Sequence, residues 1–186
     1  MGTKIVLGMA EMHMHHAVES QVIELFCDAR GSPARLAAVI FVNDQIVFTD
    51  FAPPSSLLEM SRSRNDDQIM GLEMLASALG LSTFEDHIKG KNVCLWSDNV
   101  GGECASRRGS AKNFDHNCIV HCLWLYAARP KLGLQVERVS SELNISDLPS
   151  REEYSFLFEL GAAWVKPHLA NAFWDPCSWN SLSLKG

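Results

Sequence analysis

Three apolar segments follow one another between residues 21 and 52, and their close spacing limits the possible folds more than any other feature. Their sequences are QVIELFCDA, ARLAAVIFVN and QIVFTDFA. The pair Asn43-Asp44 separates the second segment from the third, and such residues favour a tight turn. Strands that are joined by so few residues pair in antiparallel fashion. The sequence therefore predicts a three-stranded antiparallel meander that ends at Pro53 and Pro54.

The rest of the chain alternates between helical and strand patterns. Apolar residues recur at helical spacing in DDQIMGLEMLASALGL, where Gly80 is expected as the C-cap. NVCLWSD and LGLQVERVS are predicted strands, NVGGECAS a short helix or turn, and FDHNCIVHCLWLYAARP a helix that Pro130 ends. A last helix is expected from Pro149 through EEYSFLFELGAAWV. With 186 residues, 47% of them hydrophobic, the chain fits one α/β domain with a five-stranded mixed sheet and helices on both faces.

Four carboxylates occupy informative places on these elements. Asp28 and Asp98 end apolar strands, Glu73 lies on the apolar helix, and Asp147 precedes the last expected helix. Mg²⁺ prefers carboxylate ligands, and two such ions about 3.5–4 Å apart can hold both reacting oxygens of a phosphodiester. Each aspartate alone also fits a turn or a helix N-cap, but burying an unpaired Glu73 is unfavourable. The set predicts a metal-dependent nuclease, provided that the first and fourth strands are parallel neighbours.

The charge balance bears on the partner of such an enzyme. A net charge of −6 argues against a polyanionic partner, although bound Mg²⁺ reverses the local potential. Positive charge gathers at Arg107, Arg108 and Lys112, which are candidates for contacts with the substrate backbone, with a solvated helix end as the alternative. Asn99, Ser110 and Asn144 are further candidates for touching substrate or ordering the acids, with helix capping and loop bonding as the alternative.

Several phrases of the sequence resemble one family. DARGSPARLAAVIF, DDQIMGLEMLASALGL, WSDN, RRGSAKNFDHN and RVSSELNISDLPSR resemble successive segments of the ribonuclease H-like domain, most closely that of reverse-transcribing retroelements of fungi. The resemblance covers about residues 21 to 155. It suggests an N-terminal extension or linker at 1–20, a ribonuclease H-like domain at 21–160, and a C-terminal helical extension and tail at 161–186.

The resemblance also implies a reaction and roles for the four acids. Asp28 would bridge two Mg²⁺ ions, Glu73 and Asp98 would complete the shell of one ion, and Asp147 would hold the other. Mn²⁺ would serve as a substitute. The implied activity is hydrolysis of the RNA strand of an RNA–DNA hybrid, which leaves a 3′ hydroxyl and a 5′ phosphate. The hybrid is the implied partner, together with a reverse transcriptase polymerase domain of the same polyprotein.

Two departures from the family leave other functions open. Many cellular ribonucleases H carry a His in the loop before the last acid, whereas RVSSELNISD has none, and no basic, Trp-bearing handle is present. One alternative is a catalytically weak or inactive binding or scaffold module. Another is a DNA nuclease or strand-transfer enzyme of the same superfold, because a fold does not fix a substrate.

The cysteines and the apolar runs favour an intracellular protein, cytoplasmic or nuclear. The six cysteines are scattered without a C-x-x-C pair, which is typical of reduced core residues. Cys118, His121 and Cys122 have a spacing that could hold zinc, but their apolar surroundings favour core packing. No apolar run has the roughly 18–20 residues of a membrane span, and no membrane partner is expected.

Overall fold

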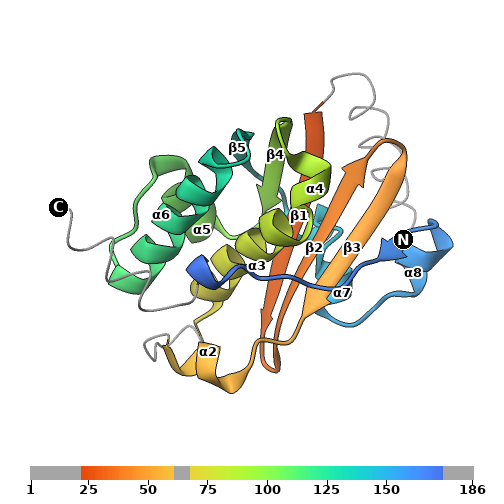
Figure 1. Ribbon diagram of the computed structural model, residues 1–186. Helices are drawn as coiled ribbons and strands as arrows, with labels where there is room; N and C mark the ends of the chain where they lie inside the picture. The colour runs from red at the N-terminus through yellow and green to blue at the C-terminus, as the bar shows by residue number, and fades with distance from the viewer. Residues whose placement is uncertain (1–21, 61–67, 174–186) are drawn as a thin grey trace.

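The structure is a computed structural model, and it describes residues 22–60 and 68–173 of the chain. These residues form one six-stranded sheet in the order β5-β4-β1-β2-β3-β6, with helices packed against it (Figure 1). The strands are β1 (Val22–Gly31), β2 (Ala34–Val42), β3 (Gln45–Phe51), β4 (Asn92–Ser97), β5 (Gly133–Arg138) and β6 (Ala163–Trp164). The helices are α2 (Ser55–Met60), α3 (Ile69–Thr83), α4 (Glu85–Ile88), α5 (Val100–Arg108), α6 (Phe114–Ala128), α7 (Asp147–Ser150) and α8 (Ser155–Glu159), with 3₁₀ turns η1 (Ser141–Leu143) and η2 (Asn171–Phe173).

The strand pairing confirms the predicted meander and its parallel continuation. β1, β2 and β3 pair in antiparallel order, and the β2–β3 turn contains Asn43 and Asp44 at φ values of 47° and 60°. Asn and Asp tolerate such left-handed backbone angles better than most residues. β4 pairs in parallel with β1 on one side and with β5 on the other. The first and fourth strands are therefore parallel neighbours, as a shared carboxylate site requires.

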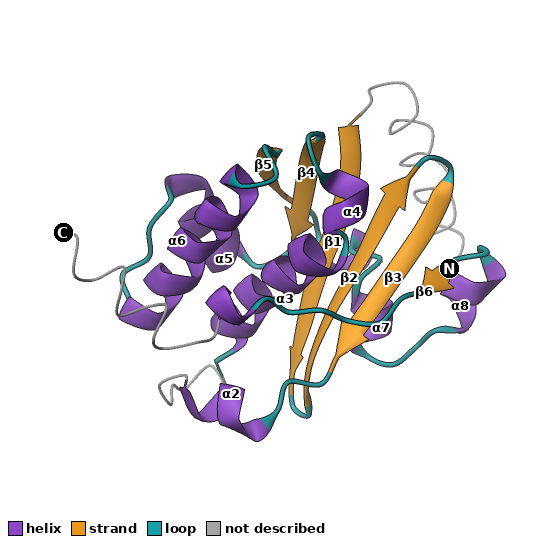
Figure 2. Cartoon of the chain, in the orientation of Figure 1, coloured by secondary structure: helices purple, strands orange, loops and turns teal. Residues whose placement is uncertain are grey.

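Each face of the sheet is covered by its own apolar cluster. Leu25 and Cys27 of β1 belong to the larger cluster, which includes residues of α3 and α6, whereas Phe26 belongs to a second cluster with Leu157 of α8. This alternation is the two-residue period of a strand that is buried on both faces. Figure 2 shows α3 and α6 on the near face and α7 behind the strands. The prediction of helices on both faces is confirmed.

Helix α3 extends beyond the predicted end, so Gly80 is not its C-cap. The helix continues to Thr83, and Phe84 is the C-cap residue. A Cβ atom at Gly80 would lie 3.1 Å from the Cβ of Ala38 and 3.1 Å from Leu25 Cδ1. The glycine therefore allows α3 to approach the sheet closely, which is a role that a sequence pattern does not separate from capping.

The prediction of one continuous last helix is wrong. Two short helices, α7 and α8, replace it, and Glu152 between them has a left-handed φ of 66°. Ion pairs from Arg30 and Arg35 to the Glu152 carboxylate hold the connection, at 3.0 Å and 2.7 Å. Beyond α8 the chain forms β6, which pairs in parallel with β3 and adds a sixth strand to the five that were predicted.

The topology is that of the ribonuclease H-like fold: an antiparallel β1-β2-β3 meander, then parallel β4 and β5, with helices on the sheet.

The division of the chain at residues 20 and 160 stays a prediction, and residues 1–21 and 174–186 lie outside the described part. Buried Phe173 joins the larger apolar cluster, so the described chain packs on the sheet up to that residue. Among the described helices, none is long and apolar enough to cross a membrane.

Candidate metal site

The candidate site begins where strands β1 and β4 stop pairing. Their parallel ladder ends at Phe26 opposite Trp96, while β1 continues to Gly31 against β2. Asp28 therefore lies just past the last β1–β4 pair, and Asp98 directly follows the last residue of β4. In α/β sheets, functional groups gather outside the carboxyl ends of parallel strands. The two aspartates meet at such an edge.

Helix α3 brings the third carboxylate to the same place. Glu73 lies one turn into the helix and is 5% exposed, while Asp28 is 4% exposed. One carboxylate oxygen of each of Asp28, Glu73 and Asp98 lies within 4.8 Å of the other two. The expectation that Glu73 meets both aspartates is confirmed. These three residues form the acidic cluster, and its spacing fits a single divalent cation.

The N-terminus of α5 is fitted closely against α3 beside the acidic cluster. A Cβ atom at Gly101 would lie 3.0 Å from Met70 Sδ, so a larger residue would require the flexible Met70 side chain to move. Asn99 caps α5 by accepting a hydrogen bond from the Gly102 backbone N–H at 2.8 Å. Of the two roles that the sequence left open for Asn99, the structure places it in capping, directly after Asp98.

Burial and mutual repulsion shift the titration of the acidic cluster. Burial first, and then the negative charges of Asp98 and Asp147, raise the pKa of Asp28 to about 7, although a hydrogen bond with Ser150 lowers it. Burial first, and then Asp28 and Asp98, raise the pKa of Glu73 to about 9. Carboxyl groups that share a dry site hold their protons in this way because one negative charge disfavours the next.

The surroundings of the acidic cluster fit a divalent cation. Among the described residues, none of its three members forms an ion pair with a lysine, arginine or histidine. The Oε2 atom of Glu73 is buried and has no hydrogen-bond partner within the described part of the chain. A buried carboxylate oxygen without a partner is unfavourable. The donor set is all oxygen, which suits Mg²⁺ or Mn²⁺ rather than a thiolate-preferring metal.

Asp147 lies near the acidic cluster but is not a member of it. It is the first residue of α7, and its charge contributes to the raised pKa of Asp28. Its Oδ1 accepts a hydrogen bond from Arg151 Nε at 2.8 Å, one helical turn later. The fourth predicted acid is therefore close to the site, but it is paired with a cation.

Asn144 orders the segment that carries Asp147. Its side-chain amide donates a hydrogen bond to the carbonyl of Cys27 at 3.1 Å, next to Asp28 in β1. Its Oδ1 accepts hydrogen bonds from the backbone N–H and the hydroxyl of Ser146. Because Asn144 is 3% exposed, it connects α7 to β1 and does not offer a surface to substrate.

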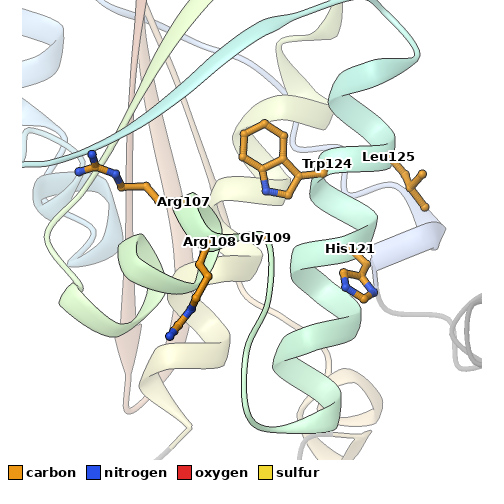
Figure 3. A pocket seen from close by; sticks show the side chains of 6 residues that line it. All are labelled: Arg107, Arg108, Gly109, His121, Trp124 and Leu125. Carbon is orange, nitrogen blue, oxygen red and sulfur yellow. The ribbon is translucent and has the colours of Figure 1, made fainter. Parts of the chain in front are cut away.

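The basic candidates lie at the other end of α5. Arg107 donates a hydrogen bond to Glu103 at 2.9 Å and lies 3.7 Å from Glu137, whereas Ser110 and Lys112 are exposed in the loop before α6. A hollow of about 480 Å³ lies between the last turn of α5 and the middle of α6, and Figure 3 shows the side chains that line it. Its lining consists of Arg107, Arg108, Gly109, His121, Trp124 and Leu125, and we call it the α5–α6 hollow.

Sequence reasoning did not single out Arg151, Ser150 or Trp124. The spacing of four residues between Asp147 and Arg151 could have predicted their ion pair, because residues four apart on a helix face each other. The alternative zinc site is not formed. The groups of metal-binding side chains in the described part of the chain do not include Cys118, His121 or Cys122.

Comparisons with known proteins do not extend these observations. No family model matches the sequence, and no curated protein matches it.

Proposed function

We propose that this chain is a divalent-metal-dependent ribonuclease H that hydrolyses the RNA strand of RNA–DNA hybrids. The observation that carries the proposal is the acidic cluster, in which β1, α3 and the end of β4 bring three carboxylates within 4.8 Å, and none of them forms an ion pair with a described residue. A ribonuclease H-like topology surrounds the cluster. The phrases of sequence that resemble retroelement domains favour the hybrid as substrate and a polymerase domain of the same polyprotein as partner.

The proposal assigns roles to the acids of this chain. Asp28, Glu73 and Asp98 would hold one Mg²⁺ or Mn²⁺ ion, and Asp147 would contribute to a second. The ions would polarise the phosphodiester and lower the pKa of the attacking water. Asn144 holds the segment before α7 against β1, and Asn99 caps the start of α5 directly after Asp98. Arg151 holds the Asp147 carboxylate, and its charge also reaches Asp28.

A second candidate is a module of the same fold that binds nucleic acid with little or no turnover. The ion pair between Asp147 and Arg151 favours it, because an acid that is held by arginine is less available to a second cation. The loop 139–146 also contains no histidine that could move a proton near the site. A DNA nuclease of this fold would need the same acids, so only substrate preference separates it from the leading candidate.

The decisive experiment compares labelled substrates with the full chain. An RNA–DNA hybrid, duplex RNA, duplex DNA and single strands are incubated with Mg²⁺, Mn²⁺ or EDTA, beside the Asp98→Asn variant. We expect metal-dependent cutting of the RNA strand of the hybrid only, and its loss in Asp98→Asn. Cutting of DNA would favour the DNA nuclease. Tight hybrid binding without any cutting would favour the binding module.

A further inference from the structure

The α5–α6 hollow is separate from the acidic cluster and lies at the opposite end of α5. The helix begins at Val100, two residues after Asp98, and ends at Arg108, which lines the hollow. A helix of nine residues with a rise of 1.5 Å per residue is about 13 Å long. The length of α5 therefore separates the hollow from the acidic cluster.

The lining of the hollow combines an uncompensated positive charge with an apolar wall. Arg108 is exposed and forms no ion pair with any residue that the structure describes, whereas the charge of Arg107 is offset by Glu103. Trp124 extends from α6 toward α5, and its indole Nε1 donates a hydrogen bond to the Ser106 carbonyl at 2.8 Å, which fixes the ring (Figure 3). Leu125 is 52% exposed.

This combination matches the chemistry of a nucleotide. An arginine with free N–H groups binds phosphate, and an indole ring offers a face on which a base can stack. The volume of about 480 Å³ lies within the range of small-molecule sites, roughly 300–1,000 Å³. A base inside a duplex is paired and stacked on its neighbours, so it cannot enter such a hollow. Only an unpaired nucleotide presents a free face to Trp124.

We propose that the α5–α6 hollow binds one unpaired nucleotide from a single-stranded extension of the nucleic acid that the acidic cluster cuts. The phosphate contacts Arg108, and the base contacts Trp124 and Leu125. This inference rests on the proposed function and specifies its substrate. The preferred substrate is a hybrid that carries a single-stranded extension beside the paired region that is cut.

The test measures binding without cleavage. Fluorescence anisotropy of labelled hybrids in EDTA gives the Kd for a blunt hybrid and for the same hybrid with a short unpaired extension, using the full chain. For the wild type we expect the extension to tighten binding about fivefold or more, as base stacking on an aromatic ring predicts. Arg108→Glu should remove this advantage, so that the blunt and the extended hybrid bind with equal Kd, while a general loss of positive charge changes both Kd values together.

Matched variants distinguish binding in the hollow from general electrostatic attraction of the nucleic acid. Arg129→Glu makes the same change of charge at another exposed arginine, at the C-terminal end of α6 and outside the hollow, and should keep the advantage. Trp124→Leu should lose it and Trp124→Phe should keep most of it, with thermal unfolding used to verify that each variant is folded. No advantage in the wild type, or equal losses in Arg108→Glu and Arg129→Glu, would overturn the proposal.

Failure of the hollow and failure of the proposed function give different results. If the hollow does not bind a nucleotide, blunt and extended hybrids bind alike, while metal-dependent cutting of the hybrid persists. If the proposed function fails, no substrate is cut with Mg²⁺ or Mn²⁺, whatever the anisotropy shows.

Discussion

Two groups of carboxylates at different edges of this sheet differ in whether positively charged partners neutralise them. Near β3 and β6, the Asp50 carboxylate pairs with Arg35 and accepts hydrogen bonds from the Tyr154 hydroxyl at 3.1 Å and the Trp164 indole N–H at 2.9 Å. Glu152 pairs with Arg30 and Arg35. We call these residues the Asp50 network. The acidic cluster of Asp28, Glu73 and Asp98 has no comparable partners among the described residues.

The contrast separates carboxylates that are neutralised by packing partners from carboxylates that could hold a metal ion. In the Asp50 network two acids face two arginines, so the charges cancel and the groups join β2, β3, β6 and the α7–α8 connection. In the acidic cluster three acids repel one another in a buried place, which disfavours the folded state without a cation. Clusters of this second kind are frequent at functional sites.

The largest expected effect is on catalysis. Glu73→Gln keeps the size of the side chain but removes a ligand charge, so we expect hybrid cleavage to fall by about 10³-fold or more. Asp50→Asn should leave the rate within about threefold, because its carboxylate only supports the fold. Initial rates of hybrid cleavage in Mg²⁺ measure both. Comparable losses of cleavage rate in the two variants would mean that the acidic cluster and the Asp50 network do not differ in function.

The two substitutions should have opposite effects on stability. Asp50→Asn leaves Arg35 poorly compensated and should lower the free energy of unfolding by about 2 kcal/mol. At pH 8 the folded state must keep Glu73 protonated whereas the unfolded chain does not, so Glu73→Gln removes this unfavourable proton uptake and should raise the free energy of unfolding by about 1 kcal/mol without metal. Urea unfolding in EDTA gives both values. A Glu73→Gln variant that is less stable than the wild type would show that the acidic cluster is not under electrostatic stress.

The dependence of stability on pH should follow from the raised pKa values. The folded state keeps the protons of Asp28 up to about pH 7 and of Glu73 up to about pH 9, whereas the unfolded chain releases them near the ordinary values of 3.8 and 4.5. Between these limits the folded state binds more protons, so stability falls as pH rises. In EDTA we expect a decline in the free energy of unfolding from pH 5 to pH 9.

The control for this pH dependence is Glu73→Gln, which removes the group with the highest pKa. Its free energy of unfolding should change less than that of the wild type between pH 7 and pH 9. A wild-type stability that rises over the range from pH 5 to pH 9 would contradict the assignment.

The smallest expected effect concerns Arg151. Its ion pair with Asp147 is exposed and lies one helical turn away, so Arg151→Ala should change the free energy of unfolding by no more than about 0.5 kcal/mol. The loss of a positive charge beside the acids should nevertheless tighten Mn²⁺ binding by about threefold. Titration calorimetry with Mn²⁺ measures this change. Weaker binding in Arg151→Ala would indicate that the arginine supports the site.

The sequence was sufficient for the parts of the molecule that depend on local patterns. The Asn43-Asp44 turn and the strand of Asp28 follow from periodicity and turn chemistry, and the parallel pairing of β1 and β4 is the condition on which the meeting of Asp28 and Asp98 depended. Glu73 was recognisable because a carboxylate on an apolar helix face requires a partner or a function. These features predict from the sequence that Asp28, Glu73 and Asp98 belong to one site.

The remaining features depend on contacts between distant segments. Gly80 has the spacing of a C-cap, but its close approach to Ala38 is a property of the packed sheet. The break at Glu152 follows from ion pairs with Arg30 and Arg35, more than a hundred residues earlier in the chain. Likewise, the α5–α6 hollow joins Arg108 and Trp124 across two helices. Short-range periodicity contains no information on such pairs.

The most direct test of the account is Mn²⁺ binding to the full chain, followed by the electron paramagnetic resonance signal of the free ion at pH 7.5. We predict that the wild type removes Mn²⁺ from solution, that Mg²⁺ competes for the site, and that Glu73→Gln and Asp98→Asn bind much more weakly while Asp50→Asn binds normally. Mn²⁺ that stays free in the presence of wild-type protein, or that binds equally to all four proteins, would contradict the account.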